Sequence, residues 1–236
     1  MSRRIMVLAI AGVVLFEYLI FFKDREPLTM KTFFARKFQL LAILVLASLM
    51  FAAHPLQAAV DLRLSPDIKS IDTDGAPTLG NPNARHKLVV YACYTCPHCK
   101  KHLPELMSAV QSGKLGSYQL IWKLWPLRTV EGSKPMALAI LAANKQNKAW
   151  AYFSALLKNP NNYEDDYIVA TAKQVGIKMD QFDADRKSFA LKQAMITSKI
   201  EGAKNGVKET PTYFIDGHEY IGSKKIDDVM AFLKSY

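Results

Sequence analysis

The chain has 236 residues, three cysteines and a formal net charge of +10; half of its residues are hydrophobic and 22% are charged. This length predicts one domain of ordinary size, or one domain with an appendage. The composition excludes a disordered or collagen-like chain, and three cysteines are too few for a dense disulfide scaffold. The positive charge raises nucleic acid or an anionic membrane as partners.

Residues 1–59 are predicted to be a targeting region, because two apolar runs precede any globular pattern. The first run spans residues 5–22, and the second spans residues 38–53. The second run has the anatomy of a secretory signal peptide, with a basic start, an apolar centre and small residues after it. Cleavage is expected after Ala58 or Ala59.

Met30 lies directly before the basic start of the second run, and we hypothesise that translation begins there. The alternative is a membrane anchor at residues 5–22, although a run of that length is marginal for spanning a bilayer. Residues 1–59 hold seven of the 31 basic and three of the 21 acidic residues, so the remainder carries +6. Its basic residues are scattered among acidic ones, which favours a solvated surface over a nucleic-acid site.

After the targeting region, residues 60–84 are polar and rich in proline and glycine, and predict an extended lead-in. Residues 87–92 are apolar and β-rich, which indicates a buried strand. Residues 97–111 follow as a helix with one apolar face, and residues 118–124 predict a second strand. This order of strand, helix and strand is a βαβ unit.

A block of helices is predicted from residue 133 to residue 207. Apolar residues spaced by three and four indicate helices near residues 136–143, 148–157 and 166–175. A longer helix is predicted from apolar residues that share one face: Phe189, Ile196, Ile200 and Ala203. This block separates the βαβ unit from the elements that close the chain.

The C-terminal residues predict two strands and a final helix. Residues 212–215 and 219–221 are β-rich and flank Asp216-Gly217, a pair typical of hairpin turns. Apolar residues from Ile226 to Leu233 then repeat at helical spacing. The fold class is therefore α/β, and in such sheets sites form where strands end and helices begin.

The first strand and helix meet at Cys96-Pro97-His98-Cys99, whose cysteine spacing suits a disulfide that opens and closes. Cys96 falls at the helix start, where free N–H groups and the macrodipole favour an anion. We therefore predict a lowered pKa and a nucleophilic role for Cys96. Pro97 fits the first helical position, and His98 adds positive charge or a hydrogen-bond donor. Cys99, one turn further, is expected to be the less exposed, resolving thiol.

A stabilised Cys96 thiolate sets the expected redox direction. It stabilises the reduced dithiol, so the disulfide is more oxidising and Cys96 is the better leaving group. Donation of a disulfide to substrates is then the favoured direction. One alternative is a permanent structural bridge. Another is a zinc site made by Cys93, Cys96, Cys99 and His102, although structural zinc sites usually join two separated ligand pairs.

The motif Cys96-Pro97-His98-Cys99 after an apolar strand resembles the active site of the DsbA family of thiol:disulfide oxidoreductases, within the thioredoxin superfamily. Residues 79–84 resemble the lead-in of DsbA-like members, and residues 206–212 resemble their cis-proline loop. Pro104 resembles the proline that kinks the active-site helix. The resemblance covers residues 77–236.

This resemblance implies a thioredoxin-like fold with an inserted helical domain. Residues 85–132 and 208–236 would form the thioredoxin-like domain, and residues 133–207 the insert. It also implies a cis bond between Thr210 and Pro211 beside the sulfurs, with the backbone at Thr210 pairing with an extended substrate. No organic cofactor is implied, because the dithiol is the redox centre.

Cys93 departs from the family pattern, in which a polar residue other than cysteine is expected. We expect it to point into the core as an inert small hydrophobe. The alternative is that it traps Cys96 or Cys99 in another disulfide and modulates activity. Structural roles are expected for the other histidines and for the aromatic residues: His86, His102 and His218 at the surface or in loops, and Trp122, Trp125, Trp150, Tyr152 and Phe153 in packing.

The sequence predicts an exported, monomeric oxidoreductase of the periplasm that donates the Cys96–Cys99 disulfide to folding proteins. Its expected partners are reduced or unfolded secreted proteins and a membrane partner that restores the disulfide, and no nucleic acid is expected. Its rivals are a disulfide reductase or isomerase of the same fold, and a metal-handling protein that uses the four-residue set named above. Residues 60–80 are too short for a separate dimerisation domain, which argues against an isomerase built that way.

Overall fold

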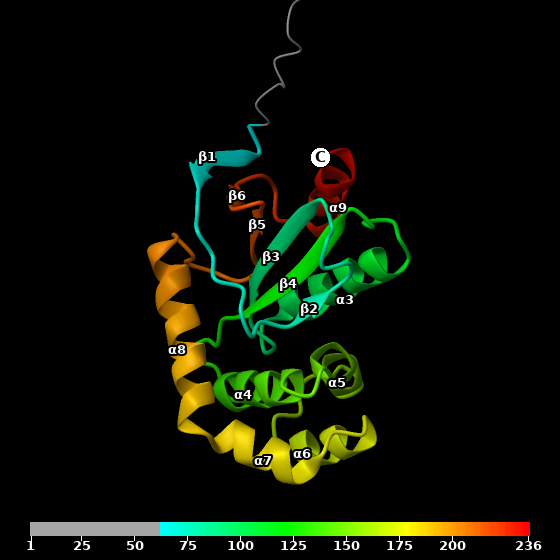
Figure 1. The fold of residues 1–236 in the computed structure, drawn as a ribbon, viewed down its shortest axis with the longest axis vertical. Coiled ribbons are helices and arrows are strands. Elements are labelled where there is room, and N and C mark those ends of the chain that lie inside the picture. Colours follow the sequence, from blue (N-terminus) through cyan, green and yellow to red (C-terminus); the bar gives the residue numbers. More distant parts are fainter. Residues whose placement is uncertain (1–61) are drawn as a thin grey trace, which may run out of the picture. The chain divides into compact units, whose positions relative to one another are not determined.

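Six strands form one mixed sheet in the computed structural model, which describes residues 62–236 (Figure 1). Their order across the sheet is β1-β6-β5-β3-β4-β2. The central strands β3 and β4 run parallel, and every other neighbouring pair is antiparallel. The strands are β1 (Leu64–Ile68), β2 (Thr78–Leu79), β3 (His86–Ala92), β4 (Tyr118–Leu124), β5 (Thr212–Ile215) and β6 (His218–Tyr220).

The central strand β3 is buried on both faces of the sheet, which explains its continuous apolar sequence. Leu88 and Val90 point into a core that includes residues of α3 (Pro97–Gln111) and α9 (Ile226–Ser235). Val89 and Tyr91 point to the opposite face, where they join a second core. Successive side chains of a strand alternate in this way, so one short run serves both layers.

Five helices lie between β4 and β5: α4 to α7 lie below the sheet in Figure 1, and α8 runs from them upward beside it. They are α4 (Ser133–Asn144), α5 (Ala149–Leu156), α6 (Asp165–Gln174), α7 (Met179–Lys187) and α8 (Phe189–Lys204). The sequence predicted all of them except α7, whose residues are mostly charged. Phe182 is the buried residue of α7 and, together with packing against α4, accounts for a helix that local periodicity did not reveal.

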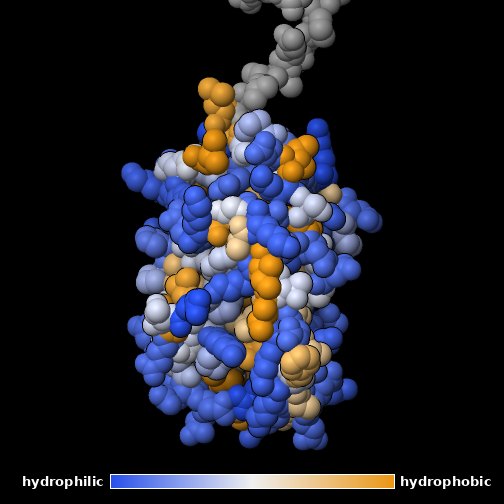
Figure 2. All heavy atoms as spheres, turned by 90° about the vertical axis from the view of Figure 1, so that its left-hand side faces the viewer, coloured by the Kyte–Doolittle hydropathy of each residue, from blue (hydrophilic) through white to orange (hydrophobic). Residues whose placement is uncertain are grey.

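Helix α8 exists as predicted, but the apolar residues from which it was predicted lie on its exposed side. The large ones form an apolar stripe along the helix (Figure 2): Phe189 (74% exposed), Ile196 (44%) and Ile200 (53%). The packed side carries Leu191, Met195 and Gly202. A Cβ atom at Gly202 would lie 2.5 Å from Cζ3 of Trp125, so only glycine allows this approach to the sheet.

The lead-in contains two strands, β1 and β2, which pair with β6 and β4. These pairings are long-range contacts, which turn-rich local sequence does not reveal. The targeting region of residues 1–59, the start at Met30 and the anchor at residues 5–22 lie outside the described residues. Across residues 62–236, every helix is either too short or too polar to cross a membrane.

The aromatic residues assigned to packing are buried as predicted: Trp122, Trp125, Trp150, Tyr152 and Phe153. The hairpin between β5 and β6 also follows the prediction. Asp216 and Gly217 connect the two strands with φ values of 50° and 87°, the left-handed conformation that such a turn requires. Within this hairpin β5 pairs with β3, and this pairing positions the loop that precedes β5.

Candidate active site

The predicted dithiol lies where β3 ends and α3 begins. Cys96 is the N-cap residue of α3 and Pro97 occupies the first turn, so the helix starts where the sequence predicted. Cys96 is 6% exposed and Cys99 is 0% exposed, while Pro97 and His98 are exposed at the surface. All three cysteines are free thiols in the structure. The reachable sulfur therefore belongs to Cys96, and Cys99 lies beneath it.

The pKa of the Cys96 thiol is lowered to about 5. A hydrogen bond from the Cys99 side chain is the largest cause, and the Thr210 side chain and the backbone N–H groups of Cys99 and His98 add to it. Together these donors outweigh burial, which acts in the opposite direction. A lowered pKa was predicted, but His98 contributes its backbone N–H rather than the imidazole that the sequence suggested.

The two thiols of the pair differ strongly in acidity. Burial raises the pKa of Cys99 far above its ordinary range, and the neighbouring Cys96 raises it further. At neutral pH the reduced site therefore holds one thiolate at Cys96 and one thiol at Cys99. This inequality is what disulfide exchange through a single attacking sulfur requires.

The loop before β5 lies against the dithiol. The Sγ atom of Cys96 lies 3.3 Å from the carbonyl oxygen of Thr210, to which Cys96 donates a hydrogen bond in its thiol form. The bond between Thr210 and Pro211 is cis, as the family resemblance implied, and Pro211 is buried. Thr212 then pairs with Tyr91 of β3, which holds this loop at the end of the same strand that delivers Cys96.

The expectation that His102 lies at the surface or in a loop is wrong, because it is buried in α3. It is 4% exposed, and its Nδ1 atom lies 2.5 Å from the hydroxyl of Tyr213. Burial is the main cause that lowers the pKa of His102. The spacing held a usable signal, because His102 stands one turn after Cys99 and one turn before Leu106 on the buried side of α3.

The four residues of the zinc alternative do not form a metal site. No three histidine, cysteine or acidic side chains are placed to share an ion anywhere in residues 62–236. The Cys93 sulfur instead contacts two hydroxyl groups, those of Thr95 and Ser133, at 3.1 and 3.0 Å. Cys93 is 1% exposed, which agrees with the expectation that it points into the core.

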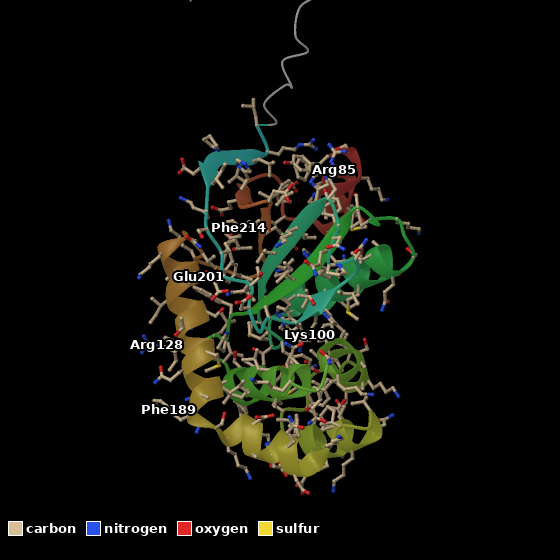
Figure 3. All side chains as sticks on the ribbon, in the orientation of Figure 1. Arg85, Lys100, Arg128, Phe189, Glu201 and Phe214 are labelled. Atoms are coloured by element: carbon tan, nitrogen blue, oxygen red, sulfur yellow. The ribbon has the colours of Figure 1, made fainter. Side chains whose placement is uncertain are left out.

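Sequence reasoning missed the contact through which the insert reaches the active-site helix. Lys100, next to Cys99, lies between the sheet layer and the insert (Figure 3). Its Nζ atom donates to the carbonyl oxygen of Pro160, the side-chain oxygen of Asn161 and the hydroxyl of Tyr163, at 2.8, 2.9 and 3.1 Å. Local sequence does not reveal these acceptors, because they lie 60 and more residues away along the chain.

Comparison with known proteins agrees with this architecture. Residues 72–235 match a family model described as thioredoxin. A thioredoxin-like oxidoreductase from Silicibacter pomeroyi is 25% identical with a TM-score of 0.60, over 69% of this chain and 92% of that one. The thiol-disulfide exchange protein alpha-DsbA2 from Wolbachia pipientis shares the fold at 22% identity, with a TM-score of 0.58 over 68% of this chain and 86% of that one.

Curated relatives are longer proteins. The Na(+)/H(+) antiporter NhaA 1 of Salinispora arenicola is 25% identical over 170 residues, which is 70% of this chain and 25% of the antiporter. The chain thus spans about a quarter of the length of the curated relatives that it matches first. The predicted thioredoxin-like fold with a helical insert is confirmed. The chain belongs to the thioredoxin family, and it shares its fold with the thiol-disulfide exchange protein named above.

Proposed function

We propose that the chain is a DsbA-like thiol:disulfide oxidoreductase, that it works as a disulfide donor, and that Cys96 is its nucleophile. The observation that carries the proposal is the lowering of the Cys96 pKa to about 5 by four hydrogen-bonding groups. A thiolate stabilised in this way favours the reduced dithiol over the disulfide. Transfer of the disulfide from the oxidised enzyme to another protein therefore lowers the free energy of the system.

The exchange proceeds in two displacement steps. A substrate thiolate attacks Sγ of Cys96, the Cys96–Cys99 bond breaks, and Cys99 leaves as a thiolate that takes up a proton. A second substrate thiolate then attacks the substrate sulfur of the mixed disulfide, and Cys96 leaves as a thiolate. The substrate loses two electrons and gains a disulfide, while the enzyme ends as the reduced dithiol.

The loop of Thr210 and Pro211 is proposed to hold the substrate chain. Thr210 is half-buried beside Cys96, and a proline after it removes one N–H donor from the loop. An extended substrate segment is proposed to pair with the backbone at Thr210, as in strand addition. The dithiol itself serves as the redox centre, without an organic cofactor.

The proposed partners are reduced or unfolded exported proteins, and a membrane disulfide oxidase that accepts the two electrons from the reduced dithiol. The proposed location is the periplasm, and the proposed state is a monomer. The secretory pattern in residues 1–59 supports this location. A structural relative from Salmonella enterica is itself described as a periplasmic thioredoxin-like protein.

The reduction potential of the Cys96–Cys99 pair tests the direction of exchange. The purified protein is equilibrated in glutathione buffers, and the oxidised fraction is measured by alkylation and mass spectrometry. A reduction potential of about −120 mV is expected, and one of about −270 mV would instead identify a reductase. Cys96→Ser must abolish exchange. In Cys99→Ser the Cys96 thiolate must attack an oxidised substrate, release one substrate thiolate and accumulate as the mixed disulfide. Stoichiometric zinc or copper in the purified reduced protein would contradict the proposal.

A further inference from the structure

Cys93 is the third cysteine, and thiol–disulfide exchange through Cys96 and Cys99 leaves it without a role. It follows β3 directly and is 1% exposed. Its sulfur lies 3.1 Å from Oγ1 of Thr95 and 3.0 Å from Oγ of Ser133. One buried thiol therefore touches two buried hydroxyl groups that belong to different parts of the fold.

The first hydroxyl belongs to the residue directly before the reactive cysteine. Thr95 is 6% exposed and precedes Cys96, the N-cap of α3. The backbone of Cys93 constrains the same turn, because the N–H of Cys96 donates to its carbonyl oxygen at 3.2 Å. A hydrogen bond to the backbone of Cys93 also acts on the pKa of Cys99. Cys93 thus holds the turn through both its main chain and its sulfur.

The second hydroxyl belongs to the first residue of the helical insert. Ser133 begins α4 and is 1% exposed. Its Oγ atom accepts a hydrogen bond from the N–H of Leu127 at 2.7 Å. Because this oxygen is already an acceptor for Leu127, its own proton is available for the Cys93 sulfur. The insert is thereby joined to the end of β3 by a chain of hydrogen bonds.

We infer that Cys93 is a positioning residue of the redox site, whose thiol couples the start of the helical insert to the turn that presents Cys96. The thiol suits this place because sulfur both donates and accepts weakly, and so can serve both hydroxyl groups at once. The inference rests on thiol–disulfide exchange at Cys96, but not on the direction proposed above. It also differs from a modulating role, because Cys93 stays reduced throughout.

Removal of the thiol tests this coupling. Cys93→Ala leaves the hydroxyls of Thr95 and Ser133 without their shared partner, and buried polar groups do not tolerate such a loss. We expect the Cys96 pKa to rise by about one unit, because the turn that aims N–H groups at the sulfur loosens. The equilibrium constant for oxidation of glutathione by the disulfide form would then fall roughly tenfold, which corresponds to a change of about 30 mV in the reduction potential. In the conservative variant Cys93→Ser, the Cys96 pKa and the equilibrium constant with glutathione should both return most of the way to their wild-type values.

A double-mutant cycle separates coupling from general damage. Ser133→Ala is expected to raise the Cys96 pKa although Ser133 is not among the groups that act on that pKa directly. The double variant Cys93→Ala with Ser133→Ala should have the same Cys96 pKa as Cys93→Ala alone, because the two residues act through the same series of hydrogen bonds. Ala142→Gly is the matched control, since Ala142 is buried in α4. The change destabilises the helix but leaves the hydrogen bonds of Thr95, Cys93 and Ser133 in place.

Three results would overturn the inference. The first is an unchanged Cys96 pKa in Cys93→Ala whose fold is intact by circular dichroism. The second is an equal pKa change in Ala142→Gly, which would mean that any loss of stability in the insert disturbs the site. The third is a disulfide of Cys93 in the oxidised wild-type protein. A wild-type Cys96 pKa near 8.5 would instead count against the donor function, and the variants would still report on the coupling.

Discussion

The Sγ atom of Cys96 lies 3.3 Å from the carbonyl oxygen of Thr210, although 114 positions separate the two residues in the chain. The contact joins the start of α3 to the loop before β5. Because the Thr210 side chain also lowers the Cys96 pKa, the reactivity of the sulfur depends on the docking of a distant strand. The site is therefore a product of the whole sheet rather than of the motif alone.

Alkylation of the reduced protein should depend on pH through the ionisation of one group, the Cys96 thiol. Since the Cys96 pKa is about 5 and the thiolate is the reactive form, the rate of alkylation by iodoacetamide should reach half its maximum near pH 5. Cys93 and Cys99 are buried and should react only in urea. Mass spectrometry of the labelled peptides gives the measurement, with Cys96→Ser as the unreactive control. A midpoint near about pH 8.5 would contradict the prediction.

Stability of the reduced protein should rise with pH over the same region. The Cys96 pKa is lower in the folded state than in the unfolded chain, so unfolding takes up a proton between about pH 5 and about pH 9. The stabilisation is present above this window and is lost as the pH falls through it. Urea unfolding of the reduced wild type and of Cys96→Ser should diverge with rising pH. Parallel curves would show that the thiolate is not stabilised by folding.

The hydroxyl of Thr210 should contribute to the acidity of Cys96. Thr210→Val keeps the shape of the side chain and removes the donor, so the Cys96 pKa should rise by about half a unit to one unit. Thr210→Ser keeps the hydroxyl and serves as the matched control. The absorbance of the thiolate, followed during a pH titration, measures the change. Equal pKa values for the two variants would remove Thr210 from the set of groups that hold the anion.

Lys100 should hold the insert to the active-site helix. Lys100→Met keeps the aliphatic stem but loses three hydrogen bonds, so the free energy of unfolding should fall by about 1–2 kcal/mol. Hydrogen exchange should accelerate in the loop of residues 158–163. Lys101→Met changes an exposed lysine next to it and should leave both quantities unaltered. Equal loop protection in both variants would mean that the loop is held by other contacts.

Gly202 should be intolerant of even one methyl group. Alanine is the better helix former, yet a Cβ atom here would lie 2.5 Å from Trp125 and 2.7 Å from Tyr91. Gly202→Ala should therefore lower the free energy of unfolding by about 1–3 kcal/mol. The neighbouring exposed change Ala203→Gly should lower it by only about 1 kcal/mol, through helix propensity alone. A higher free energy of unfolding in Gly202→Ala than in the wild type would show that α8 does not pack closely against Trp125 and Tyr91.

The sequence by itself determined the elements and the chemistry, because both depend on residues close together in the chain. The helix Pro97–Gln111 and the strand Tyr118–Leu124 were predicted with the bounds that the structure shows. Their patterns are local: apolar spacing, β-rich runs and a proline at the helix start. The pair of Cys96 and Cys99 is equally local, since one helical turn holds both sulfurs.

Only the tertiary structure decided which groups act on that chemistry. Thr210 reaches Cys96 through strand pairing, and Lys100 reaches the insert through acceptors that local pattern does not reveal. The burial of His102 and the exposed apolar stripe on α8 depend on which helix side meets the sheet. Packing between distant segments sets burial and hydrogen-bond partners, and these in turn set the acidity of Cys96 and the surroundings of Cys93.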